Sequence, residues 1–542
     1  MAVENLPTLQ LGFAILTLVL LRHCYRNNLG MSFGINNVPG PKSPSWLKGN
    51  FGQIFSPTAW GFHEFLARTY GSTVRISGPF GKASLYTCDS KAMHAILVKE
   101  QDVFEDDEGF IKTNQMLFGE GLLGTLGHRH QKQRKMLNPV FSAAHIRDMV
   151  PTFFEIAHKL ESALKGQVQR SEKQEVDILS WMARTALELV GQAGLGYSFD
   201  PLTSGEATHP YTEIINQLMP TVMRMQYWFL IVLPLASRIG SPNFRRFAVN
   251  LMALFWNDLR HIRDMIDYMH DIASKIYDSK KQASEKGDEE AVQQLGRGKD
   301  LIMKENMKAT DEDRLEDHEV IAQAITAFSV DEQWIQLRNP EAQDKLRNEI
   351  MEAKRLNGGQ DLSYDELVSL PYLDAVCRET LRLYAPVSTA IGRTACQDVI
   401  IPLSKPLIGL NGMVMNEITV PKGTNVTVSI LNSNRNPDLW GKDADEWKPE
   451  RWLSPLPATV IDARIPGVYS HLMTFIGGRR SCIGFKFSQL EMKVVISVLV
   501  ESFKLSPSVH DAEIFWQMNN VTNPIVGKVQ LPQLPIVIHL AH

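Results

Sequence analysis

A cysteine placed directly before a helix constrains the fold of this chain more than any other feature. The stretch from Phe475 to Gly484 reads FIGGRRSCIG. Apolar residues then recur at helical spacing: Phe487, Leu490, Val494 and Val498. At such a position, unpaired backbone N–H groups and the positive end of the helix dipole favour a thiolate over a thiol. The sequence therefore predicts that Cys482 binds a metal, whereas an isolated cysteine would be interpreted as a buried, inert thiol.

The residues around this cysteine predict the kind of group that is bound. Gly478 and Gly484 allow a large flat ligand to approach the backbone, and Arg480 can pair with a carboxylate of that ligand. Phe475 can shield the sulfur from water. Five fixed residue types at fixed offsets arise by chance in a chain of this length with a probability of about 1 in 10,000 or less. Together these residues predict a socket for a haem.

The pattern Phe-x-x-Gly-x-Arg-x-Cys-x-Gly resembles the haem-ligand loop of the cytochrome P-450 family. The resemblance implies a mainly α fold with a minor β-sheet, an α+β arrangement, in a single large haem domain. It implies haem b as the cofactor, with Cys482 as the axial thiolate that helps to cleave a bound O–O bond. The implied activity is that of a monooxygenase, which inserts one oxygen atom from O2 into an apolar organic substrate. Electrons would come from NADPH through a cytochrome P-450 reductase.

A second motif of the family lies upstream, between Asp374 and Pro386. Glu379 and Arg382 are three residues apart and therefore project from one face of a helix. Pairs of this kind are common on solvated helix faces, which is the alternative interpretation. The resemblance implies that Arg451, in the sequence Pro-Glu-Arg, joins them in a buried ion network. We expect these three residues to be structural rather than catalytic, and no catalytic residue is assigned.

Two further segments resemble parts of the family that contact the haem propionates. In the stretch Gly127 to Lys135, His130 stands where the family usually has Trp, and Arg134 follows four residues later, as in the family. Either side chain can donate a hydrogen bond to a carboxylate. Arg393 lies where many members have another propionate partner, although an ordinary surface arginine is an equally acceptable interpretation.

Charge and cysteine content exclude several classes of protein. The chain has 56 Lys and Arg against 60 Asp and Glu, a net charge of −4, which argues against a nucleic-acid partner. Five scattered cysteines exclude a disulfide-stabilised secreted scaffold. A local basic face remains possible as the docking site of an acidic electron donor, or as an ordinary solvated face: Arg129, Lys132, Lys135, Arg479 and Lys486.

The first residues predict attachment to a membrane. An almost unbroken apolar run from Leu6 to Leu21 is followed by Arg22, His23 and Arg26, an order typical of a retained signal anchor. The run is short for a span of about 20 residues, so an interfacial helix or a buried helix are alternatives. We expect residues 1–26 to be a single-pass anchor in the endoplasmic reticulum membrane, residues 27–45 a proline-rich hinge, and residues 46–542 a cytoplasmic haem domain.

Periodicity predicts a largely helical body. Helical patterns dominate from Ala143 to Ile350 and from Phe485 to Phe503, and β-branched runs predict strands at Thr73–Ile76 and Asn425–Ile430. The charged stretch Lys280–Asp300 predicts a solvated loop. The sequons at Asn425 and Asn520 are interpreted as chance matches, because a cytoplasmic body does not meet the glycosylation machinery.

One family motif is missing. The resemblance implies a long helix bearing Ala/Gly-Gly-x-Asp/Glu-Thr, which relays protons to oxygen at the iron. Here the helix that begins at Asp317 passes through Val330 directly to Trp334, and roughly ten residues are absent, about 15 Å of helix. A misplaced splice junction is one explanation. Alternatively the deletion is real, and Asp331, Ser329 or Thr326 partly substitutes, or the protein binds haem without efficient oxygen activation.

The resemblance leaves the substrate open. Family substrate contacts come from the loop around Phe104–Leu123, from Met219–Leu233 and from the region after Pro386. Methionine and aromatic residues in the second segment suit a bulky terpenoid, sterol or polycyclic aromatic, of secondary metabolism or xenobiotic origin, although core or membrane packing explains them equally. Segments such as Asn339–Leu346 resemble membrane-bound fungal members. The alternative functions are a haem-thiolate isomerase or dehydratase and a non-enzymatic haem binder.

Overall fold

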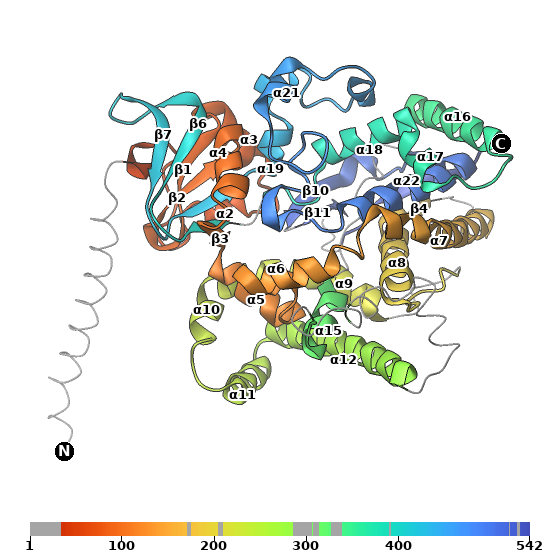
Figure 1. Cartoon of the computed structure of the whole chain (residues 1–542), viewed down its shortest axis with the longest axis horizontal. Coiled ribbons are helices and arrows are strands. Elements are labelled where there is room, and N and C mark those ends of the chain that lie inside the picture. The colour runs from red at the N-terminus through yellow and green to blue at the C-terminus, as the bar shows by residue number, and fades with distance from the viewer. Residues whose placement is uncertain are drawn as a thin grey trace.

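The fold is mainly helical, and the described residues form four small sheets. A computed structural model describes residues 34–170, 175–203, 210–285, 306, 314–326, 339–389, 392–519, 521–527 and 532–541. The strands within residues 73–87 and 399–420 lie at one end of the molecule, those within residues 514–526 lie near its middle, and the strand Glu175–Asp177 lies among the helices of the other end (Figure 1). The expected mainly α fold with a minor β component agrees with this architecture, whereas the predicted anchor at residues 1–26 lies outside the described residues.

The largest sheet has five strands in the order β1-β2-β8-β5-β3, and β2 and β8 are its parallel pair. Its strands are β1 (Thr73–Ser77), β2 (Ala83–Thr87), β3 (Phe104–Asp106), β5 (Arg393–Ala395) and β8 (Asn425–Val428). The remaining strands form two hairpins and a three-stranded sheet: β6 (Val399–Ile408) with β7 (Val414–Val420), β10 (Ile514–Asn519) with β11 (Val521–Val526), and β4 (Glu175–Asp177) with β12 (Pro535–Leu540) and β9 (Phe503–Pro507).

Helices occur along both halves of the described chain. The first half of the chain contains α2 (Phe51–Ile54), α3 (Trp60–Tyr70), α4 (Ser90–His94), α5 (Glu108–Phe118), α6 (Gly127–Leu137), α7 (Ala143–Arg170), α8 (Ile178–Val190), α9 (Pro210–Arg224), α10 (Leu233–Ala236), α11 (Pro242–Ala253) and α12 (Asn257–Glu285). The second half contains α15 (Asp317–Thr326), α16 (Pro340–Leu356), α17 (Tyr364–Ser369), α18 (Pro371–Leu383), α19 (Ile430–Asn434), α20 (Pro437–Trp440), α21 (Ala458–Ala463) and α22 (Phe485–Ser502).

Helix α22 runs through the main core and fixes the position of the cysteine that precedes it. It spans Phe485–Ser502, which confirms the helix predicted at Phe485–Phe503. The helix packs along α7, where the rings of Phe487 and Phe153 meet edge to face with centroids 4.9 Å apart. Leu490 and Val494 are buried in the same cluster. Because both helices are embedded in the core, the start of α22 is a rigid platform.

Local side-chain hydrogen bonds explain where the structure departs from the predicted elements. The strand predicted at Asn425–Ile430 is too long, since the hydroxyl of Ser429 caps the N-terminus of α19 by accepting the N–H of Asn432. The stretch Phe104–Leu123 is not a simple loop, because the carboxylate of Asp107 caps α5. The loop predicted at Lys280–Asp300 is wrong for its first part, because α12 continues to Glu285, and the rest lies outside the described residues.

The hinge predicted at residues 27–45 is described from Gly34 onward, and it is fastened to the body. The side-chain oxygen of Asn37 accepts the N–H of Asn411 at 3.0 Å, and its carbonyl accepts the N–H of Leu410 at 2.8 Å. Both partners lie in the turn of the β6–β7 hairpin. Across the described ranges, no single helix meets the length and hydropathy criteria of a membrane span, and one pair bent by 68°, Gln217–Arg224 with Trp228–Ala236, meets them jointly.

Candidate functional site

The loop that contains Cys482 is closed by its own hydrogen bonds. It connects the 3-10 turn η10 (Gly478–Arg480) to α22. The N–H of Cys482 donates to the carbonyl of Phe475 at 3.0 Å, and the N–H of Ser481 donates to the carbonyl of Gly478 at 3.1 Å. The Phe475 ring packs against the ring of Phe485, with centroids 6.2 Å apart. The aromatic residue expected beside the sulfur therefore closes the loop that presents it.

Two opposing effects act on the pKa of the Cys482 thiol. Burial raises its pKa, whereas the N–H of Gly484 at the start of α22 and the guanidinium of Arg134 act to lower it. The helix N-terminus thus lowers the pKa of the thiol, as expected, but desolvation raises the pKa by more. The cysteine nevertheless has an exposed surface, which fits a side chain that faces a space inside the protein. A bound cation would supply the charge that stabilises the thiolate.

Arg134 supports the cysteine loop directly. From α6 its guanidinium donates to the carbonyl oxygen of Ser481 at 2.7 Å and to the hydroxyl of Ser481 at 3.0 Å. The residue predicted to contact a propionate therefore also holds the residue next to Cys482. His130, one turn earlier on the same helix, is 4% exposed, and burial followed by the nearby Arg480 and Arg134 lowers its pKa to about 3. Its imidazole is therefore neutral at physiological pH.

Two more arginines reach the same region from different elements. The guanidinium of Arg480 donates to the carbonyl of Thr125 at 2.7 Å and lies 3.0 Å from a carboxylate oxygen of Asp106. Arg393 is 4% exposed, so the interpretation as an ordinary surface arginine is wrong, and it also pairs with Asp106. Burial lowers the pKa of both guanidinium groups to about 10, with Arg480 contributing at Arg393.

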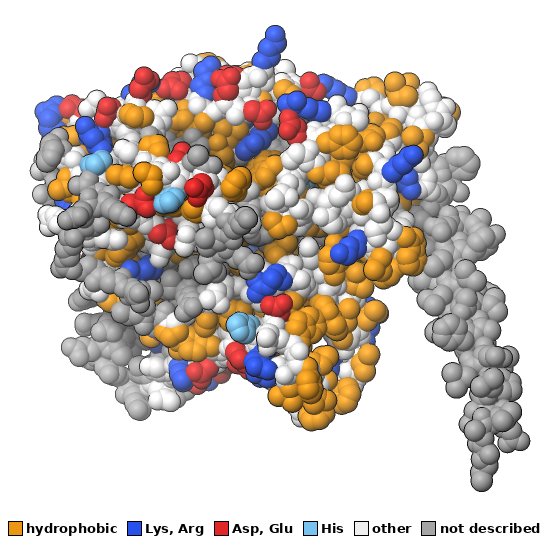
Figure 2. All heavy atoms as spheres, turned by 180° about the vertical axis from the view of Figure 1, so that it is seen from behind, with side chains coloured by type: hydrophobic (Ala, Val, Ile, Leu, Met, Phe, Trp, Pro, Cys, Tyr) orange, Lys and Arg blue, Asp and Glu red, His pale blue; other side chains and the backbone are white. Residues whose placement is uncertain are grey.

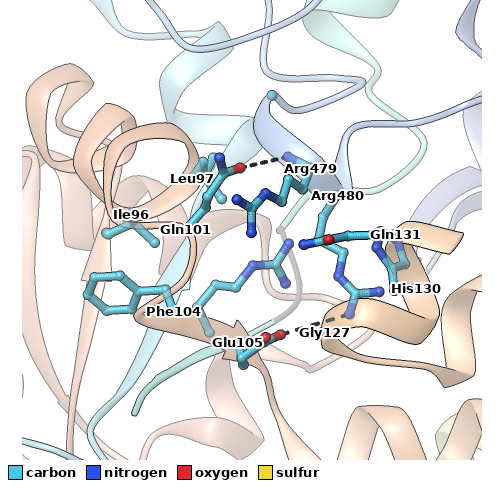
Figure 3. Close-up of a pocket in the computed structure, with 12 residues that line it drawn as sticks. Ile96, Leu97, Gln101, Phe104, Glu105, Gly127, His130, Gln131, Arg479 and Arg480 are labelled. Carbon is cyan, nitrogen blue, oxygen red and sulfur yellow. Dashed lines mark hydrogen bonds and ion pairs between the residues drawn. The ribbon is translucent and has the colours of Figure 1, made fainter. Parts of the chain in front are cut away.

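Arg393 lines one pocket together with His130, Arg479 and Arg480, which come from α6 and η10 (Figure 3). The opposite wall comes from β3 and from the π-helical turn η3 (Ala95–Lys99). Arg479 also pairs with Asp102, and its N–H donates to the side-chain oxygen of Gln101 at 3.0 Å. Arg129 likewise pairs with Glu120 and Glu319. Acidic side chains of the same chain therefore neutralise part of the positive charge of the predicted basic face.

The two glycines of the loop have different roles. Gly478 has a φ of +76°, and a Cβ there would lie 1.8 Å from the carbonyl oxygen of Leu97. The close packing of η10 against η3 is therefore one reason for glycine at position 478, and the approach of a ligand there stays a prediction. At Gly484 a Cβ would meet only Phe141, at 3.9 Å, so the space beside the start of α22 is open.

The structure brings Glu379, Arg382 and Arg451 together. Arg382 donates to both carboxylate oxygens of Glu379 at 2.9 Å, and Arg451 donates to one of them at 3.0 Å. Glu379 and Arg382 are fully buried, and the indole of Trp452 and the N–H of Lys448 complete the shell of the carboxylate. Burial alone would raise the pKa of Glu379, but the two arginines hold it below its ordinary value. The network is separate from the pocket and ties α18 to the segment at Pro449–Trp452.

The segment proposed for substrate contacts is mainly a core element. Met223, Met225 and Phe229 are buried, and the last two belong to the main hydrophobic cluster. Trp228 is partly exposed and packs edge to face with Trp256 at 4.9 Å between ring centroids. For these residues the structure agrees with the packing interpretation.

The residues present fit a haem. Among the described residues, no three His, Cys, Asp or Glu side chains are arranged to hold a metal, so a metal at Cys482 needs its other ligands from a cofactor. A porphyrin provides four nitrogen ligands and two carboxylates. The buried guanidinium of Arg393, the half-buried guanidinium of Arg480 and the neutral imidazole of His130 form a set of donors suited to those carboxylates. One thiol ligand and a cationic wall are the groups that a haem-thiolate site requires.

Comparison with known proteins agrees with this site. The chain belongs to the cytochrome P450 family, because the sequence model described as Cytochrome P450 matches residues 38–330 and 335–530. It is 48% identical over 517 residues to cytochrome P450 monooxygenase 91 of Postia placenta, covering 93% of this chain and 94% of the relative. It is 42% identical over 509 residues to the ganoderic acid synthetase CYP5150L8 of Ganoderma lucidum, covering 91% and 92%. Members of this family are oxidoreductases that incorporate oxygen and bind haem through a cysteine thiolate.

The family match is interrupted where the sequence lacks the oxygen motif. The break covers residues 331–334, and the structure describes α15 only to Thr326 and resumes at Asn339. The alignment with cytochrome P450 monooxygenase 81 of Postia placenta, 42% identical and covering 100% of this chain and 99% of the relative, has 559 positions against 542 residues here. This chain therefore lacks residues that the relative has. Ser329 and Asp331, two of the predicted substitutes, lie outside the described residues, as does the side chain of Thr326.

Sequence reasoning missed Asp106 and Ser481. Asp106 contacts two of the candidate arginines, and Ser481 accepts both hydrogen bonds of Arg134. Ser481 is adjacent to Cys482, so its position was available from the motif. Asp106 had no such signal, because its role depends on a strand pairing between distant parts of the chain.

Proposed function

We propose that this protein is a haem-thiolate monooxygenase that inserts one oxygen atom from O2 into an apolar organic substrate. The single observation that supports this most strongly is the Cys482 loop at the start of α22, which Arg134 holds and whose Arg479 and Arg480 line the pocket. Haem b, when bound, supplies the iron at which oxygen is activated, with electron density from the thiolate.

The protein's own residues have distinct tasks in this proposal. Cys482 ligates the iron, and the N–H of Gly484 together with Arg134 stabilises the negative charge on sulfur. Phe475 limits access of water to the loop. Arg393, Arg480 and His130 hold the cofactor carboxylates, and the neutral state of His130 allows it to donate one hydrogen bond without adding charge.

The family supports the proposal for the electron donor, and one relative supports the proposal for the substrate. We propose that electrons come from NADPH through a cytochrome P-450 reductase. One relative is named a ganoderic acid synthetase. For the present chain we propose a bulky terpenoid, sterol or polycyclic aromatic as substrate, in secondary metabolism or xenobiotic oxidation.

We also propose that residues 1–26 anchor the protein in the endoplasmic reticulum membrane, with the catalytic domain on the cytoplasmic side. The apolar run Leu6–Leu21 supports the anchor. A patch of exposed hydrophobic side chains on and just after α11 supports contact of the body with lipid, and it includes Phe247 at 64% and Phe255 at 88% exposure (Figure 2). Deleting residues 1–26 should weaken membrane association, and adding Phe247→Ser and Phe255→Ser should abolish it in a vesicle flotation assay. Unchanged flotation of the triple variant would contradict this proposal.

The interrupted α15 region favours a second candidate function. A haem-thiolate isomerase or dehydratase acts on an already oxidised substrate and does not require a proton relay to oxygen. This candidate rests on the break in the family match at residues 331–334. A non-enzymatic haem binder is the third candidate.

Product analysis with candidate apolar substrates separates these functions. The monooxygenase should form oxygenated product from O2 with NADPH and a cytochrome P-450 reductase, and ¹⁸O₂ should label that product. Conversion of a hydroperoxide without reductase or NADPH, together with no product from O2, would favour the isomerase or dehydratase. Bound haem with neither reaction would leave the haem binder.

A further inference from the structure

A buried carboxylate joins two of the arginines that face the candidate haem site. Asp106 is the last residue of β3, Arg393 is the first residue of β5, and the two are directly opposed in the antiparallel pair. Side chains at opposed positions lie on the same face of a sheet, with Cβ atoms about 5 Å apart. The ion pair between them is therefore a consequence of strand register. The other carboxylate oxygen of Asp106 lies 3.0 Å from Nε of Arg480, which comes from η10.

The two guanidinium groups need a counter-ion inside the protein. Arg393 is 4% exposed, and the side chain of Arg480 is 17% exposed. Buried like charges oppose each other, and removing the partner of a buried charge is strongly destabilising. The lowered pKa of both arginines reflects this desolvation.

The other charged groups nearby do not replace Asp106. Glu105 lies 3.9 Å from Arg480 and is partly exposed, and Asp102 is engaged with Arg479. His130 is neutral and brings no negative charge. Among the described carboxylates, Asp106 is the one within ion-pair distance of both Arg393 and Arg480.

We propose that Asp106 is a positioning residue that stands in for the cofactor's carboxylates and holds Arg393 and Arg480 in place before haem binds. This inference rests on the proposed function, since it takes haem as the ligand. Once haem is bound, its two carboxylates also compensate the guanidinium charges. Asp106 is therefore more important to the apoprotein than to the holoprotein.

The first test compares the thermal stability of both forms. Asp106→Asn removes the charge and keeps the shape, and it should lower the unfolding temperature of the apoprotein by about 3–5 °C. The loss in the holoprotein should be less than half as large. Glu108→Gln, an acid two residues further on in an exposed pair with Arg238, is the matched control and should change both forms by about 1 °C or less. Equal losses in apoprotein and holoprotein for Asp106→Asn would overturn the proposal, because a merely structural residue affects both alike.

A second test uses only the holoprotein and therefore does not depend on a folded apoprotein. The rate of haem transfer to excess apomyoglobin should be unchanged or several-fold lower for Asp106→Asn, because the guanidinium groups then have the haem carboxylates as their main counter-ions. Arg393→Gln should raise that rate. If Asp106→Asn accelerates haem loss as much as Arg393→Gln does, the proposal is wrong. If the unaltered chain binds no haem at all, the proposed function fails together with this inference.

Discussion

Two regions that the family resemblance assigns to the haem site, the Cys482 end and the α15 end, differ sharply in this chain. At the Cys482 end, the loop motif is complete, Arg134 fixes the loop, and the family match is continuous from residue 335 to residue 530. At the α15 end, the first turns are fixed equally well: Arg129 and Gln133 both donate to Glu319, at 2.7 and 2.9 Å. After Val330 the family match breaks, and the oxygen motif is missing.

This contrast separates two tasks that the family normally combines. In the proposed function, the Cys482 end binds and ligates haem. The α15 end lacks the acid and hydroxyl that relay protons to oxygen. We therefore expect this chain to bind haem through a thiolate and to oxygenate its substrate more slowly than a relative that carries the acid and the hydroxyl.

The largest effect is expected at Cys482. Cys482→Ser replaces the thiolate by a weak oxygen ligand, and we expect product formation to fall below detection and haem affinity to fall by more than about 100-fold. Haem content per protein and product yield measure both. Cys396→Ser, a change at an exposed cysteine outside the pocket, is the matched control and should leave both unchanged. Retention of full haem content by Cys482→Ser would refute the assignment of the ligand.

Restoring the α15 end should produce the next largest effect. Inserting the missing helix segment of a close relative between Val330 and Trp334 should raise oxygenation with NADPH and reductase by about 10²- to 10⁴-fold, the usual contribution of positioned acid–base groups. A same-length insert with Ala in place of the acid and hydroxyl is the control. If both inserts raise turnover equally, helix length rather than proton relay limits the reaction. If neither does, the two ends are not separable in the way proposed.

The buried ion network around Glu379 lies outside the candidate haem site, so a change there should affect the stability of the fold. Glu379→Gln leaves two buried guanidinium groups without their carboxylate and should reduce the free energy of unfolding by about 3–5 kcal/mol. Urea denaturation measures this loss. Glu352→Gln, in an exposed pair with Arg355, should have no measurable effect. Comparable midpoints for the two variants would show that the network does not stabilise the fold.

The smallest effect is a pH dependence at His130. Its pKa is about 3 in the folded apoprotein, mainly because of burial and then because of Arg480, Arg134 and Arg479, against an ordinary value of 6.5. The unfolded chain therefore binds more protons than the folded chain between these values, and stability falls as the pH drops below about 6.5. Urea midpoints of the apoprotein at pH 7 and pH 5 should differ less in His130→Phe than in the unaltered chain. The exposed His128→Phe is the control, and an unchanged pH dependence in His130→Phe would contradict the assignment.

Local sequence patterns predicted the Cys482 end of the site, and the resemblance placed the residues of the ion network. The helix after Gly484 and its cysteine follow from a short motif, and the pairing of Glu379 with Arg382 follows from helical spacing. Asp106 was not predictable, because its contact with Arg393 depends on the register of strands far apart in the chain. The need for glycine at position 478 was not predictable either, because it arises from the backbone carbonyl of Leu97 in η3. Long-range packing thus determined what the local patterns did not predict.

The spectrum of the reduced, carbon-monoxide-bound protein tests the central claim most directly. That claim is that the Cys482 end of this 542-residue chain forms a haem-thiolate site in spite of the interrupted α15 end. The account predicts that the unaltered chain shows the Soret band of thiolate-ligated haem. A protein that binds no haem, or that shows only the band of haem without a thiolate ligand, would contradict it.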